Sequence, residues 1–129
     1  MLTTSLRGND MRFLPTMIHG ILDYLVGLLV IVLPFTLSLQ GSQKWTLVVI
    51  GILVILYSAM TDYEMGLVRY LRIRFHLALD AVFGLAMLLT PGLLDFPADA
   101  RWPNYVLGVL ALVLVAVTDV RALGTAATK

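Results

Sequence analysis

Residues 19–27 read His-Gly-Ile-Leu-Asp-Tyr-Leu-Val-Gly, and residues 76–84, 57 positions later, read His-Leu-Ala-Leu-Asp-Ala-Val-Phe-Gly. Each copy places a histidine, an aspartate and a glycine at intervals of four within a strongly apolar run. Intervals of four keep the three positions on one face of an α-helix. Ionisable side chains are costly inside apolar helices, so this repetition predicts a polar site to which both copies contribute.

The composition is that of an integral membrane protein. Of the 129 residues, 60% are hydrophobic and only 13% are charged, with a mean hydropathy of +0.93. A soluble domain carries about 25% charged residues. Cysteine is absent, which excludes disulfides and thiolate metal sites. The few basic residues are not interleaved with aromatic ones, so we expect no nucleic-acid partner, and the length fits one membrane domain over residues 1–129.

Four apolar runs predict an all-α fold, a bundle of four transmembrane helices. The first run is too long for the apolar part of a signal peptide, so we interpret it as a retained span. Pro34 predicts a kink or an early end of that span, residues 40–43 predict a turn, and Thr90-Pro91-Gly92 predicts the end of the third span. We expect the spans at residues 13–39, 44–61, 75–89 and 104–118.

Basic residues indicate the orientation, because loops rich in lysine and arginine stay in the cytoplasm. The side that holds both termini and the 62–74 link carries seven of them, namely Arg7, Arg12, Arg69, Arg72, Arg74, Arg121 and Lys129. The opposite side carries only Lys44 and Arg101. We therefore expect both termini in the cytoplasm. Trp45 and Trp102 are expected to anchor spans two and four at the opposite interface.

The interval of 57 residues extends well beyond the opening motif. It also relates Arg12 to Arg69, Pro34 to Pro91, Trp45 to Trp102, Gly51 to Gly108, Ala59 to Ala116, Thr61 to Thr118 and Asp62 to Asp119. The pattern predicts a duplicated helical hairpin, with residues 12–68 as the first repeat and 69–125 as the second. Two spans per repeat give both copies the same orientation, so we expect a pseudo-twofold axis along the membrane normal.

This arrangement predicts one polar cluster near the cytoplasmic face. An up-down-up-down bundle places spans one and three diagonally, with both histidines about one helical turn below the surface. Close packing is expected just beyond the cluster, at Gly27, Gly51, Gly84 and Gly108. The candidate binding residues are His19, Asp23, His76 and Asp80, with Asp62 and Asp119 as further members and Tyr24 and Tyr63 nearby.

Several roles are compatible with such a cluster. The histidines and aspartates would pair along their own helices and fix the helix register, with Thr61-Asp62 and Thr118-Asp119 supplying partners or marking the membrane exit. They would alternatively bind a divalent metal ion, provide two axial ligands to a haem, or form part of a proton relay. Basic residues of the link could hold a lipid or quinone headgroup, although such residues more often set the topology.

The segment Met11-Arg-Phe-Leu-Pro-Thr-Met-Ile-His-Gly-Ile-Leu-Asp-Tyr-Leu-Val-Gly27 resembles the opening of small bacterial membrane proteins of the SPW-repeat type. The resemblance extends over about residues 11–120. Of the Ser-Pro-Trp signature only the prolines are kept, in Leu33-Pro34-Phe35 and Thr90-Pro91-Gly92. The resemblance implies a bacterial inner-membrane protein with four spans and duplicated hairpins, and it implies no particular activity.

These observations favour a non-enzymatic structural or accessory protein of the inner membrane. The chain is small, and no set of nucleophile, base and orienting residue is visible. Besides the lipid bilayer, the expected partner is a second copy of the chain or another membrane protein. The alternative is a protein that binds a ligand, a metal or haem, or relays protons, through the duplicated His/Asp cluster.

Overall fold

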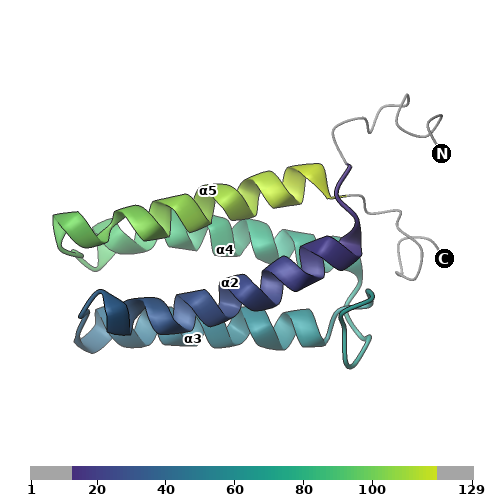
Figure 1. Ribbon diagram of the computed structural model, residues 1–129, viewed down its shortest axis with the longest axis horizontal. Coiled ribbons are helices and arrows are strands. Elements are labelled where there is room, and N and C mark those ends of the chain that lie inside the picture. Colours follow the sequence, from purple (N-terminus) through teal and green to yellow (C-terminus); the bar gives the residue numbers. More distant parts are fainter. Residues whose placement is uncertain (1–12, 119–129) are drawn as a thin grey trace.

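The computed structural model describes residues 13–118, which form four long helices and one short 3₁₀ turn (Figure 1). Within this range the only β-structure consists of two isolated bridges, so the all-α prediction is confirmed. The helices are α2 (Thr16–Thr36), α3 (Gly41–Ala59), α4 (Ile73–Leu93) and α5 (Trp102–Val117), with the 3₁₀ turn η1 (Ala98–Ala100) before α5.

The four helices form two hairpins that lie against each other. Helix α2 packs along α3, α4 packs along α5, and α3 also contacts α4. Figure 1 shows the hairpins as two layers, with the start of α2, the end of α5 and the α3–α4 link at one end of the bundle. The bounds of α4 are those of α2 shifted by 57 residues. The predicted hairpin pairing is confirmed, while the twofold axis stays a prediction.

Glycines allow the helices of each hairpin to touch through their backbones. A Cβ atom added to Gly51 would lie 2.7 Å from the carbonyl oxygen of Gly27 on α2. In the second hairpin, a Cβ atom added to Gly108 would lie 2.8 Å from the carbonyl oxygen of Gly84. No side chain fits at either distance, so the close approach expected from the sequence is present in both hairpins.

Several predicted helix boundaries differ from the structure. Helix α2 covers Thr16–Thr36 rather than residues 13–39. Helix α3 begins at Gly41 rather than at about residue 44, because the turn is completed over residues 37–40, where Ser38 takes a φ of 57°. Helix α4 continues through Pro91 to Leu93 instead of ending near residue 89. Proline removes the N–H group that would bond the carbonyl of Met87, and Asn104 on α5 donates its side-chain amide to that carbonyl at 3.3 Å instead.

All four helices have the length and composition needed to cross a membrane. The candidate spans contain 19 to 21 residues, the fourth counting η1 together with α5, and their mean hydropathies are 1.5 to 2.1. Large apolar side chains are exposed along every helix, as expected for lipid-facing surfaces, and these include Leu28, Val49, Val82 and Val109. The chain is therefore a small multi-pass membrane protein.

The link between α3 and α4 folds back over the beginning of α2. Tyr24 donates a hydrogen bond to the Met65 carbonyl, and Thr16 donates one to Glu64. Tyr63, expected near the cluster, is wholly buried, and its hydroxyl donates to Asp23. The link thus closes the end of the bundle where the ionisable residues of the spans lie.

Candidate polar site between the hairpins

Four ionisable side chains from α2 and α4 meet between the two hairpins. His19 and Asp23 come from α2, and His76 and Asp80 come from α4. One nitrogen or oxygen atom from each residue lies within 4.8 Å of the corresponding atoms of the other three. Both histidines are 0% exposed, and the aspartates are 6% and 4% exposed. The structure therefore brings together the four residues that the repeated motif singles out.

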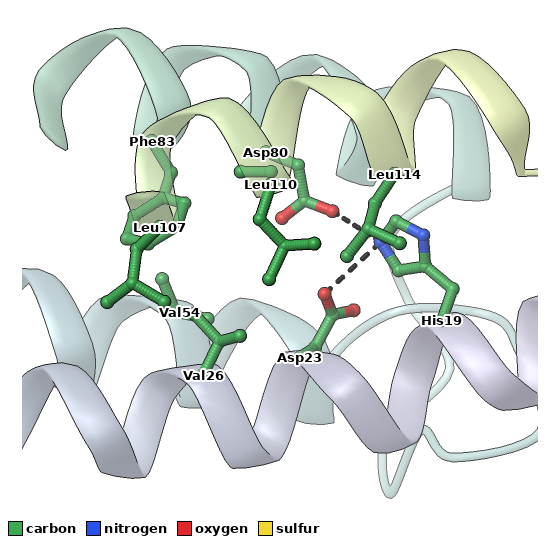
Figure 2. Close-up of a pocket in the computed structure, with 10 residues that line it drawn as sticks. His19, Asp23, Val26, Val54, Asp80, Phe83, Leu107, Leu110 and Leu114 are labelled. Atoms are coloured by element: carbon green, nitrogen blue, oxygen red, sulfur yellow. Dashed lines mark hydrogen bonds and ion pairs between the residues drawn. The ribbon is translucent and has the colours of Figure 1, made fainter. Parts of the chain in front are cut away.

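The shortest contacts in the cluster run between the hairpins. His19 Nε2 lies 2.6 Å from Asp80 Oδ2, and His76 Nε2 lies 2.8 Å from Asp23 Oδ2. Within each helix, the histidine Nε2 lies 3.1 Å from the carboxylate four residues later. Figure 2 shows His19 pointing between Asp23 and Asp80. The pairing that we expected along each helix is thus present, but the closer pairs join one hairpin to the other.

A threonine holds the remaining nitrogen of each histidine. Thr118 Oγ1 lies 2.5 Å from His19 Nδ1, and Thr61 Oγ1 lies 2.6 Å from His76 Nδ1. Each threonine donates its hydroxyl hydrogen to the carbonyl four residues earlier, at Leu114 and Tyr57 respectively. The threonine oxygens must therefore accept hydrogen bonds from Nδ1–H. This arrangement leaves the two Nε2 atoms facing the carboxylates, to which they donate hydrogen bonds when each imidazole carries a proton on both nitrogens.

Two tyrosines hold the carboxylates from outside the cluster. Tyr57 donates to Asp80 Oδ1 at 2.5 Å, and Tyr63 donates to Asp23 Oδ2 at 3.0 Å. Burial, followed by the negative charge of Asp23, raises the pKa of the Tyr63 hydroxyl, which therefore stays protonated and remains a donor. Each of the four ionisable residues consequently has one partner outside the cluster.

Each threonine contacts the histidine of the other hairpin. Thr61 forms a β-bridge with Leu71, directly before α4, and Leu14, directly before α2, forms a bridge with Thr118. The bridges bring Thr61 to His76 of the second repeat and Thr118 to His19 of the first. Each threonine thus contacts a histidine of the other repeat, an exchange between the hairpins that the interval of 57 residues does not predict.

The remaining predicted members lie elsewhere or outside the described range. Asp62 is buried and its backbone N–H donates to the Leu71 carbonyl at 2.6 Å, but its carboxylate does not belong to the group of four. The Tyr24 hydroxyl donates a hydrogen bond to the Met65 carbonyl in the link rather than to a residue of the cluster. Asp119 lies outside the residues that the structure describes. Sequence reasoning missed Tyr57, whose counterpart in the second repeat is Leu114, so the interval of 57 residues carries no signal for it.

A small cavity adjoins the cluster on the side where Leu114 takes the place of a tyrosine. His19, Asp23 and Asp80 line it together with apolar side chains, which Figure 2 shows around the carboxylates. Its volume is about 10 Å³, which is about the space that one water molecule needs. A haem would have to displace the two carboxylates from between the histidines, so this geometry does not favour the haem hypothesis.

The comparison with family models gives one match, to the SPW repeat domain over residues 17–118. The chain belongs to the SPW repeat family. The matched region contains the cluster and both threonines, so the polar site lies wholly within the SPW repeat domain. No curated protein and no solved structure matches the chain.

Proposed function

We propose that this SPW repeat protein is a structural or accessory component of the bacterial inner membrane, without enzymatic activity, in which the His/Asp cluster joins the two hairpins. The observation that carries the proposal is the crosswise pairing, His19 with Asp80 and His76 with Asp23. These contacts connect segments that belong to different repeats. Polar contacts of this kind fix the relative position of the two hairpins. Apolar side chains alone do not specify that position in a bilayer, because lipid is as apolar as they are.

The burial of the cluster supports a role inside the protein. Its histidines and aspartates have protein partners, and the adjoining cavity has a volume of about 10 Å³. A substrate of even a few atoms would have to displace one of these contacts. Each polar contact between helices in a bilayer contributes about 0.5–2 kcal/mol, so the cluster as a whole is a substantial link between the hairpins.

The outer surface supports an accessory role. Each long helix presents exposed apolar side chains, among them Leu28, Val49, Val82 and Val109, which are available to lipid, to a second copy of the chain or to another membrane protein. We propose that one such helix face binds a second copy or a partner membrane protein. We propose that both termini lie in the cytoplasm, and the exposed Arg69, Arg72 and Arg74 at the link end support this orientation.

Photo-crosslinking in intact membranes tests this function. A photoreactive amino acid is placed at Val82 or Val109, which are 63% and 53% exposed, and at the fully buried Val30 as the matched control. We expect the exposed positions to give an adduct with one defined protein, either a second copy or a partner. Val30 should give none, because it contacts only its own chain.

Two results would contradict the proposal. One is the absence of protein adducts from exposed positions on all four helices, with lipid adducts alone. The other is purification of the chain as a stable monomer that turns over a defined substrate.

A further inference from the structure

We propose that His19, Asp23, His76 and Asp80 form a buried binding site for one divalent transition-metal ion of the zinc type. The inference goes beyond the proposed function, because hydrogen bonds alone could join the hairpins. Four side chains offer two imidazole nitrogens and two carboxylate oxygens within 4.8 Å of one another. This donor set suits Zn²⁺ and related first-row ions.

The distances in the cluster are close to those of a four-coordinate site. The four contacts between histidine Nε2 and carboxylate oxygen atoms measure 2.6 to 3.1 Å. Bond lengths of about 2.0–2.1 Å in a tetrahedral zinc site separate neighbouring ligand atoms by about 3.3 Å. The histidine and carboxylate atoms that pair in these contacts would need to move apart by about 0.2 to 0.7 Å to reach that separation. The other ligand pairs already lie within 4.8 Å of each other, and the cavity beside Leu114 provides room for the adjustment.

The outer contacts of the four residues are those that metal ligands require. Metal-bound histidines donate their second ring N–H to a fixed acceptor, and ligating carboxylates are hydrogen-bonded from outside. Here Thr118 and Thr61 accept from the two Nδ1–H groups. Tyr57 and Tyr63 donate to the two carboxylates. Held by these partners, both Nε2 atoms and both carboxylates face a common position between the hairpins.

The charges also balance. Two carboxylates and two neutral imidazoles carry a total charge of −2, which one divalent cation neutralises. Burying an unbalanced charge in an apolar environment is very costly, whereas a neutral assembly avoids that cost. Since all four positions come from the protein, the site resembles structural zinc sites, which are closed, rather than catalytic ones, which keep a position open. We therefore assign the ion a structural role.

Metal analysis and Co²⁺ titration test the site directly. The full chain is purified in detergent through an affinity tag without histidines, and its metal content is measured after extraction without chelator. We expect about one divalent ion per chain. After that ion is removed, Co²⁺ should bind with a 1:1 end point and give the intense visible absorption of a tetrahedral complex.

Variants identify the ligands. Asp80→Asn should abolish the Co²⁺ spectrum, and Thr61→Val should weaken Co²⁺ binding by about 10–100-fold through the orientation of His76. Thr90→Val is the matched control, because Thr90 also donates to a carbonyl four residues earlier but contacts no histidine. It should leave the titration unchanged.

The wild-type measurement decides the proposal even if a variant fails to fold. Folded wild-type protein with neither stoichiometric metal nor the tetrahedral Co²⁺ spectrum would overturn it. A spectrum that persists in folded Asp80→Asn would overturn it as well. Either result would leave the crosswise joining of the hairpins intact, because that joining needs only the hydrogen bonds.

Discussion

At the scale of single residues, the cluster depends on hydroxyl groups as much as on charges. The hydroxyl groups of Thr61 and Thr118 each donate a hydrogen bond to a backbone carbonyl. Each threonine oxygen can therefore only accept a hydrogen bond from the histidine beside it. The histidines are thereby fixed in one orientation, with Nε2 turned towards the opposite hairpin. A threonine at the end of a span is thus part of the site.

Replacing Thr61 by valine should destabilise the protein by about 1–2 kcal/mol, since the buried Nδ1–H of His76 loses its acceptor. Thr90→Val is the matched control, because it loses the same kind of bond to its own helix and no histidine contact. Its cost should be close to zero. Thermal unfolding of both variants in one detergent measures the difference. Equal stability of the two variants would show that the threonine does not hold the histidine.

The candidate site illustrates which residues a sequence can reveal. His19, Asp23, His76 and Asp80 were predictable, because they occur twice in one register inside apolar runs where such residues are costly. Tyr57 was not predictable, because it occurs in one repeat only. The exchange of Thr61 and Thr118 between hairpins depends on β-bridges formed outside the helices, which no helical periodicity describes.

At the scale of elements, the helix positions follow from the sequence but the ends do not. Apolar length and the interval of 57 residues fix four helices and their pairing. Helix α4 continues past Pro91, and Asn104 donates to the carbonyl that the proline leaves without its N–H partner. Helix α2 likewise continues for two residues past Pro34, although Leu47 stands there at the position of Asn104, so a proline near the end of a span does not by itself mark the boundary.

The glycine contacts give a prediction for each hairpin. Gly51→Ala and Gly108→Ala should each destabilise the protein by about 1–3 kcal/mol, since the new methyl group would meet a backbone oxygen 2.7 or 2.8 Å away. Gly92→Ala is the control: it lies within α4 with nothing within 4 Å of the added atom. It should be neutral or stabilising by up to about 1 kcal/mol. The free energy of unfolding is measured for all three variants. An equal loss of stability in Gly92→Ala, Gly51→Ala and Gly108→Ala would contradict the close packing of the helices.

At the scale of the whole molecule, the distribution of charge makes the orientation testable. The chain contains no cysteine, so single cysteines can report which side of the membrane each end faces. We expect Leu67→Cys, in the link, to react with a membrane-impermeant maleimide only in inside-out vesicles, because we propose that the link end faces the cytoplasm. Ala98→Cys, an exposed position before α5, should react in right-side-out preparations. The reverse pattern would contradict the proposed orientation.

The central claim is that crosswise pairs join the two hairpins, and a double-mutant cycle on His19 and Asp80 tests it most directly. The free energy of unfolding is measured in detergent for His19→Ala, Asp80→Ala and the double variant. A parallel cycle on His19 and Thr90, which share no partner, serves as the control. We predict a coupling energy of at least about 1 kcal/mol for His19 and Asp80, and additivity within about 0.5 kcal/mol for the control pair. Additivity of His19 and Asp80 within that same limit would contradict the account.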